Sequence, residues 1–185
     1  MRTRDRRVDR ASPFQIDTNL VKASGGLPNI NRLEQWHSDG VVNISMSDVA
    51  QSEAAIGSPA RARKAFSRIV TVSTNLTPQE KAKRDEIEGI LFPSGASSTN
   101  EQNDVDIVFH AWKNRFTLIT NDGASHRQPG GILGRRAALA AIGVKVTSDV
   151  DAVSWVEEQV CQRDERERQW SQTTGEQLPG WVGED

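Results

Sequence analysis

Four acidic residues are the strongest candidates for chemistry in this sequence: Asp17, Glu53, Asp104 and Asp122. Each follows a short apolar run or lies early in a stretch with helical spacing beside one. Parallel strands end at the same edge of a sheet, where ligands bind, so we expect the four carboxylates to lie in one cleft. Carboxylates brought close together repel one another unless a cation is present. Oxygen ligands suit Mg²⁺ or Mn²⁺, which activate water and stabilise charge on a phosphoryl oxygen. The set therefore predicts hydrolysis of phosphodiester bonds.

Each acid taken alone also has a purely structural interpretation. Asp104 could cap its own helix, Asp17 could begin a turn, and Glu53 could lie on a solvated helix face. These roles account for the residues one at a time. Their shared position at one expected edge of a sheet favours the metal site.

Two glycine- or acid-containing motifs are weaker signals. Asp104-Val105-Asp106 has the DxD arrangement of some phosphatases and glycosyltransferases, but that motif needs a preceding apolar strand and Glu101-Gln102-Asn103 is polar. The run Gly130-Gly131-Ile132-Leu133-Gly134 has neither dinucleotide-binding nor phosphate-loop spacing. We interpret it as a loop that leads into a helix.

The three histidines, His37, His110 and His126, do not form a recognisable catalytic triad with a serine, because no serine lies in a nucleophile-elbow pattern. The position of His110 within a helix favours a packed or exposed side chain. His126 follows Asp122 in a loop, and its contact with substrate is left open.

Composition and charge exclude several classes of protein. The formal net charge of -2 over 185 residues excludes binding of nucleic acid by bulk positive charge alone. Cys161 is the one cysteine, so neither an internal disulfide nor a thiolate zinc site can form. The longest nearly apolar stretch, 137–144, is far below the roughly 18 residues that span a bilayer, and 1–10 does not resemble a secretory signal. We expect a cytoplasmic protein with no membrane contact.

Alternating strands and helices predict an α/β fold of three layers, α/β/α, around a mostly parallel sheet of about five strands. The expected strands cover 14–16, 41–44, 69–72, 116–120 and 144–146. The expected helices cover about 30–39, 47–56, 59–68, 77–91, 104–114, 133–142 and 149–160, with a polar loop over 93–103. In this interpretation 1–13 is a flexible basic arm, 14–160 is the nuclease domain, and 161–185 is an extension that docks loosely or binds a partner.

Three segments carry a resemblance to a known family. They are Gln15-Ile16-Asp17-Thr18-Asn19, then Asn43-Ile44-Ser45 followed by Val49 and Glu53, and last Asp104 to Ala111 followed by Phe116 to Asp122. In this order they resemble the PIN domain, a compact α/β nuclease fold of many toxins in toxin–antitoxin pairs and of RNA-processing factors.

The resemblance implies a PIN-like nuclease in which Asp17, Glu53, Asp104 and Asp122 bind Mg²⁺ or Mn²⁺ and activate a water that attacks RNA. It assigns to Asn19 the orientation of Asp17, and to Thr120 the support of the strand end near Asp122. The sequence departs from the family after Asp122, where many members carry a further acid and Gly123-Ala124-Ser125 stands here. Whether Asp106 supplies an extra carboxylate, and whether one or two metals bind, stays open.

The resemblance also implies an RNA substrate and an antitoxin-like protein partner, and dimers are frequent among such proteins. A noncatalytic PIN-like module that binds RNA or protein is the alternative, and a structure-specific DNA nuclease is a third. Candidate substrate contacts are the basic residues expected near the cleft: Arg61, Arg63, Lys64, Lys81, Lys83, Arg84, Arg127, Arg135 and Arg136.

Overall fold

A five-stranded parallel sheet forms the centre of the protein in a computed structural model, which describes residues 4–8, 10, 12–21, 26–56, 58–67, 69–72, 75–123 and 130–185. The strands are β1 (Phe14–Ile16), β2 (Ile44–Ser47), β3 (Ile69–Thr71), β4 (Thr117–Ile119) and β5 (Lys145–Thr147). Their order is β3-β2-β1-β4-β5, and every pairing is parallel. The predicted α/β class and central parallel sheet are confirmed.

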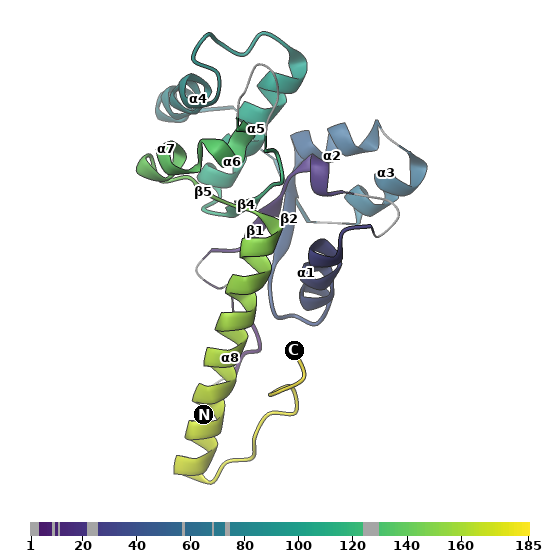
Figure 1. The fold of residues 1–185 in the computed structure, drawn as a ribbon, viewed down its shortest axis with the longest axis vertical. Coiled ribbons are helices and arrows are strands. Elements are labelled where there is room, and N and C mark those ends of the chain that lie inside the picture. The colour runs from purple at the N-terminus through teal and green to yellow at the C-terminus, as the bar shows by residue number, and fades with distance from the viewer. Residues whose placement is uncertain are drawn as a thin grey trace.

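Helices surround this sheet (Figure 1). They are α1 (Pro28–Ser38), α2 (Asp48–Ala55), α3 (Pro59–Phe66), α4 (Pro78–Leu91), α5 (Thr99–Lys113), α6 (Gly131–Gly134), α7 (Arg136–Ala141) and α8 (Asp149–Thr174), together with the 3-10 turn η1 (Thr18–Leu20). Within the described part of the chain, no helix is both long enough and apolar enough to cross a membrane.

Side-chain alternation along the central strand β1 separates two helical layers. Phe14 meets Trp155 of α8 edge to face, with ring centroids 5.7 Å apart. The next residue, Gln15, points the other way, because its Nε2 donates to the Ile107 carbonyl of α5 at 2.8 Å. The sheet therefore lies between α8 on one face and α5 on the other.

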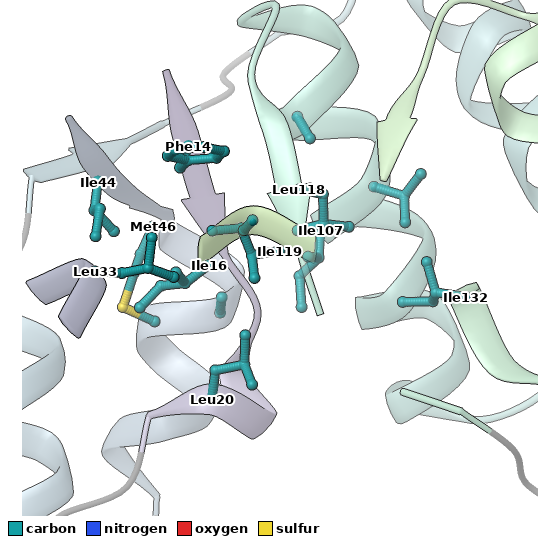
Figure 2. Packing of buried hydrophobic residues seen from close by; sticks show 14 of the residues in the cluster. Phe14, Ile16, Leu20, Leu33, Ile44, Met46, Ile107, Leu118, Ile119 and Ile132 are labelled. Carbon is teal, nitrogen blue, oxygen red and sulfur yellow. The ribbon is translucent and has the colours of Figure 1, made fainter. Parts of the chain in front are cut away.

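The apolar core lies on both faces of the sheet (Figure 2). Leu33 of α1 lies beside Ile44 and Met46 of β2, and all three side chains are buried. Ile107 of α5 and Leu118 of β4 are fully buried as well. Burial of these side chains is the main favourable contribution to folding, and it fixes the sheet edge where β1 and β4 end.

The second strand lies three residues later than the expected 41–44. Val41 and Val42 donate their backbone N–H groups to the Trp36 carbonyl, so they close the end of α1 instead of joining the sheet. Ser47 ends β2 and its hydroxyl caps α2 by accepting from the Ala50 backbone N–H at 3.1 Å. The predicted helix over 47–56 is thus present, and Glu53 lies in its second turn.

The prediction of a polar loop over 93–103 is wrong at its end, because the helix begins earlier than expected. Ser98 and Glu101 form a capping box, in which each side chain accepts from the other residue's backbone N–H, and α5 begins at Thr99. Asp104 therefore lies in the second turn of this helix and does not open it.

Two further elements differ from the sequence-based expectation. The helix expected over 133–142 is divided at Arg135 into α6 and α7. The last helix, α8, continues without a break past the expected boundary after residue 160, as far as Thr174. Figure 1 shows its distal half extending away from the sheet, with both chain ends beside it.

Candidate functional site

Asp17 comes directly after the central strand and is held by two hydrogen bonds. Its Oδ1 accepts from the Thr18 backbone N–H at 2.6 Å, and its Oδ2 accepts from the Thr120 hydroxyl at 2.6 Å. Only 4% of Asp17 is exposed. The bond to Thr120 crosses from the end of β1 to the end of β4, so the sheet itself sets the position of this carboxylate.

Glu53 reaches the same edge from α2. Its Oε2 accepts from the Thr18 hydroxyl at 2.7 Å, and the Thr18 backbone N–H is the group that binds Asp17. One residue of the η1 turn thus contacts two of the four acids. Because α2 begins at the cap that ends β2, the short turn between strand and helix brings Glu53 toward η1.

Asp122 is fixed by the first residues of α6, the short helix that begins at Gly131. Its Oδ2 accepts from the Ile132 backbone N–H at 2.8 Å, and its carbonyl accepts from the Leu133 backbone N–H at 3.2 Å. Gly131 makes this approach possible with a positive φ of 55°. A Cβ at that position would lie 2.5 Å from Asp122 Oδ2 and 2.7 Å from its carbonyl carbon.

All four predicted acids line one open pocket of about 360 Å³ at the carboxyl edge of the sheet. Its lining residues are Asp17, Thr18, Asn19, Glu53, Arg61, Asn100, Asp104 and Asp122. The structure therefore brings together residues that are separated by more than a hundred positions in the chain. Their roles in metal binding and catalysis stay predictions.

Burial, together with the neighbouring acids, raises the pKa values of Asp17 and Asp104. Burial raises the pKa of Asp17 to about 6, against the opposing effect of its hydrogen bonds from Thr120 and Thr18. Burial also raises the pKa of Asp104 to about 7, and the negative charges of Asp17, Asp122 and Glu53 add to that rise. The pocket is a place where negative charge accumulates at a cost in free energy, which a bound cation would relieve.

The donor set fits a hard divalent cation, because it consists of carboxylate oxygens with threonine and asparagine oxygens beside them. Within the described ranges, no three acidic, histidine or cysteine side chains are arranged to hold a metal ion. Asp17, Glu53 and Asp122 are turned instead toward the hydrogen-bond donors described above. Mutual repulsion favours that arrangement when the charges are not offset.

Asn19 and Thr120 form the support that the resemblance assigns to them. Asn19 Nδ2 donates to the Thr120 hydroxyl at 3.2 Å, and this hydroxyl in turn donates to Asp17. The Asp122 backbone N–H also donates to Thr120 Oγ1, at 3.0 Å. Asn19 therefore acts on Asp17 through Thr120 and not by direct contact.

Asp106 lies outside this pocket. Its Oδ1 accepts from Arg84 Nε at 2.6 Å, across the contact between α4 and α5. The arginine also donates to Gln102 at 2.7 Å. Asp106 is thus a partner of Arg84 on α4 in this structure, and it is not among the residues that line the pocket.

His110, like Asp106, is not among the residues that line the pocket. His110 is buried in α5, with Nε2 3.6 Å from Asp48 of α2, and burial lowers its pKa. It is packed between helices, as its position in the sequence favours. His126, like Arg127, lies outside the described residues.

Half of the eight described basic candidates form ion pairs away from the pocket. Lys83 pairs with Glu86 and lies over the Trp112 ring, and Arg84 pairs with Asp106. Lys64 pairs with Glu34 and Arg136 with Asp151. Arg61 is the basic residue among those that line the acidic pocket.

Three residues of the site carry signals that sequence analysis could use only in part. Asn100 lies one helical turn before Asp104, and the Ser98–Glu101 capping box is the signal that extends α5 to include it. Gly131 lies in a run interpreted as a loop into a helix, whereas in the structure it is the first residue of α6, and no spacing rule links it to Asp122. Arg61 is one of several basic candidates until the fold turns α3 toward the pocket.

Comparison with known proteins adds little to this description. No family model and no curated protein matches the chain. Among solved structures, the chain is similar to the crystal structure of VapBC2 from Rickettsia felis bound to a DNA fragment from their promoter. The identity is 16% and the TM-score 0.46, over 73% of this chain and 97% of that chain. A likeness at that level carries no conclusion about activity.

Proposed function

We propose that this protein is a metal-dependent endoribonuclease whose active site is the acidic pocket. The observation that carries the proposal is that Asp17, Glu53, Asp104 and Asp122, from four separate segments, all line one pocket at the carboxyl edge of a parallel sheet. A binding module has no need of four mutually repelling carboxylates, two of which have raised pKa values.

In this proposal the four acids would hold Mg²⁺ or Mn²⁺, which would supply an activated water and offset charge on a phosphoryl oxygen. The chain's own contribution is position: Thr120 and the Thr18 backbone fix Asp17, and the Ile132 backbone N–H fixes Asp122. Hydrolysis joins the oxygen of water to phosphorus and breaks the bond from phosphorus to the leaving oxygen, which gains a proton as the water loses one.

The choice of RNA as substrate, and of an antitoxin-like protein as a restraining partner, rests on the resemblance of three sequence segments to PIN domains. A toxin of this kind stops growth when it is produced without its partner. We expect expression of the chain in a bacterial host to arrest growth, and the Asp104→Asn variant to grow normally.

The decisive experiment is cleavage of labelled RNA and of labelled single-stranded DNA in Mn²⁺, Mg²⁺ or EDTA. Asp104→Asn should lower the rate of RNA cleavage by more than about a hundredfold, the upper end for residues that support a metal site. Asp106→Asn is the matched control, because it removes the same charge two residues away on α5, at a side chain paired with Arg84. It should leave cleavage nearly unchanged.

The outcomes separate the alternatives. Cleavage of DNA alone supports a DNA nuclease. Equal inactivity of wild type and Asp104→Asn on every substrate contradicts the catalytic proposal and favours a binding module. Thermal unfolding gives an independent measure: Mn²⁺ should raise the Tm of the wild type, and Asp104→Asn should remove most of that rise.

A further inference from the structure

Arg61 is a cation in the first turn of α3 that faces a pocket otherwise lined by acids and neutral polar groups. Ser58 caps this helix and Pro59 occupies its first position, so Arg61 lies where the helix dipole disfavours positive charge. The helix gains nothing electrostatically from an arginine there. Its position is therefore explained by what it contacts.

Two hydrogen bonds fix the guanidinium group. Nε donates to the Val21 carbonyl at 2.9 Å, and Nη2 donates to the Thr18 carbonyl at 2.7 Å. Both acceptors belong to the η1 turn and its end, directly after Asp17. Carbonyl groups bear no net charge, so these bonds orient the guanidinium group without neutralising it.

The remaining N–H groups of a guanidinium held in this way can still donate. Arginine has five N–H donors in a planar fork, and the two bonds to carbonyls use two of them. The fork matches two oxygens of a phosphate group, and this match is the reason that arginine is favoured for phosphate recognition.

Other cations of α3 do not share this arrangement. Lys64 pairs with Glu34 of α1 at 2.9 Å. Arg63 is exposed and is not among the residues that line the pocket. The same short helix thus carries an arginine at the pocket and an arginine outside it.

We propose that Arg61 forms a phosphate-binding subsite of the acidic pocket, which contacts a phosphodiester group of the bound RNA. The subsite rests on the proposed nuclease function and deepens it. An RNA strand brings one negative charge per nucleotide into a pocket of four carboxylates, and a fixed guanidinium on the α3 wall offsets the repulsion at one phosphate. Arg61 is a substrate contact, and its bonds to Thr18 and Val21 hold it in position for that contact.

The test measures binding of a short fluorescein-labelled single-stranded RNA by anisotropy over a range of KCl concentrations. All proteins carry Asp104→Asn and EDTA is present, so that no cleavage interferes. Each phosphate contact on a single strand contributes about 0.7 to the slope of log K against log salt. Arg61→Gln should lower the magnitude of that slope by about 0.7 and weaken binding. Arg63→Gln, with the same loss of charge on the same helix, should keep the wild-type slope.

If Arg61→Gln and Arg63→Gln have equal slopes of log K against log salt, the subsite is overturned, even if Arg61→Gln binds RNA less tightly. A residue that only tethers η1 changes the affinity without changing the number of phosphate contacts. Arg61→Lys keeps the charge and loses the fork, so it should bind RNA less tightly at an unchanged slope. Unchanged affinity in Arg61→Lys also overturns the proposal, and this comparison stands if the glutamine variant fails to fold.

Cleavage by proteins with Asp104 intact separates this proposal from the nuclease function. If these proteins cut RNA while Arg61→Gln leaves the salt slope unchanged, the subsite is wrong and the nuclease stands. If the protein neither cuts nor binds RNA, both are wrong.

Discussion

The Thr120 hydroxyl connects three parts of the candidate site. It donates to Asp17 Oδ2 and accepts from the Asp122 backbone N–H and from Asn19 Nδ2. No part of Thr120 is exposed to solvent. A hydroxyl can donate one hydrogen bond and accept two, so each of its possibilities is used here. One oxygen atom thus sets the relative position of two acids from different strands.

Replacing Thr120 by valine keeps the shape of the side chain and removes this hydroxyl. The buried Asp17 carboxylate loses a donor, and the N–H of the half-buried Asp122 and the exposed Asn19 side chain lose their acceptor. We expect the free energy of unfolding to fall by about 2 kcal/mol, within the range for buried polar groups left without partners. Urea unfolding measures this loss, and the Tm increase caused by Mn²⁺ should shrink with it.

Thr117→Val is the matched control for that substitution. Thr117 begins β4, the strand that Thr120 directly follows, is half-buried, and bonds through its hydroxyl to Ser12 at 2.9 Å. Its removal should cost less than about 1 kcal/mol, because water reaches the groups that it leaves. Equal losses at the two positions would show that the Thr120 hydroxyl has no special role at the site.

At the scale of elements, the start of α6 holds Asp122 through backbone N–H groups. Its approach to Asp122 depends on Gly131, where φ is 55° and where a Cβ would overlap the Asp122 carboxylate and carbonyl carbon. Gly143 provides a comparison, because its φ is 85° and nothing lies within 4 Å of an added Cβ. The two glycines share the conformational requirement and differ in the steric one.

Gly131→Ala should therefore displace Asp122, whereas Gly143→Ala should not. We expect Gly143→Ala to cost about 1 kcal/mol in unfolding free energy for the positive φ alone, with RNA cleavage intact. Gly131→Ala should cost at least about 2 kcal/mol and lower cleavage by tenfold or more, in the range for residues that support a metal site. Unfolding and cleavage assays on both variants test this. Similar rates of RNA cleavage by the two proteins would contradict the role assigned to Gly131.

The contact between α5 and α2 contains a buried titratable group, His110. Burial lowers its pKa below the usual 6.5, although the charge of Asp48 partly opposes this effect. At pH values between the lowered pKa of the folded protein and 6.5, residue 110 binds more protons in the unfolded chain than in the folded protein. Its contribution to stability is therefore complete above pH 6.5 and is lost as the pH falls through the folded pKa.

His110→Leu removes this dependence. The difference in unfolding free energy between the variant and the wild type should shift in favour of the variant as the pH is lowered from 8 to 5. Titrations of Asp17 and Asp104 occur in both proteins and cancel in the difference. Urea unfolding at the two pH values measures it, and a difference that does not change with pH contradicts a buried neutral His110.

Local sequence signals predict most of these elements. They fail where two local signals conflict, or where a contact between distant residues determines the structure. Thr77 and Glu80 mark the start of α4 by a capping box, and the structure has it there. The equivalent pair Ser98 and Glu101 lies in a segment that Pro93 and Gly95 make resemble a loop, so the start of α5 is missed. Asp17 and Asp122 are found because carboxylates after strands are a strong signal, and Glu53 and Asp104 because they lie early in helices beside expected strands. The support from Gly131 depends on where α6 meets Asp122, which no local pattern contains.

At the scale of the whole molecule, the two ends of the chain meet along the distal half of α8, away from the sheet (Figure 1). Arg163 is 4% exposed and donates to Asp164 at 2.6 Å, to Asp185 at 2.8 Å and to the Arg6 carbonyl at 2.6 Å. It also lies over the Trp181 ring, 4.4 Å from the centroid. The residues expected to form a flexible arm and a loosely docked extension thus share a buried ionic cluster.

Arg163→Met leaves the buried carboxylate of Asp164 without the cation that it pairs with, and it leaves Asp185 paired with Arg6 alone. Breaking a buried ion pair in this way is strongly destabilising, so we expect a loss of about 3 kcal/mol in unfolding free energy and faster proteolysis near both chain ends. Arg166→Met is the control, because Arg166 is exposed on the same helix and should cost less than about 0.5 kcal/mol. The acidic pocket lies at the carboxyl edge of the sheet, so under conditions where the variant stays folded its rate of RNA cleavage should match that of wild type. A loss of cleavage without unfolding would mean that the two regions are coupled, which no contact of the described residues predicts.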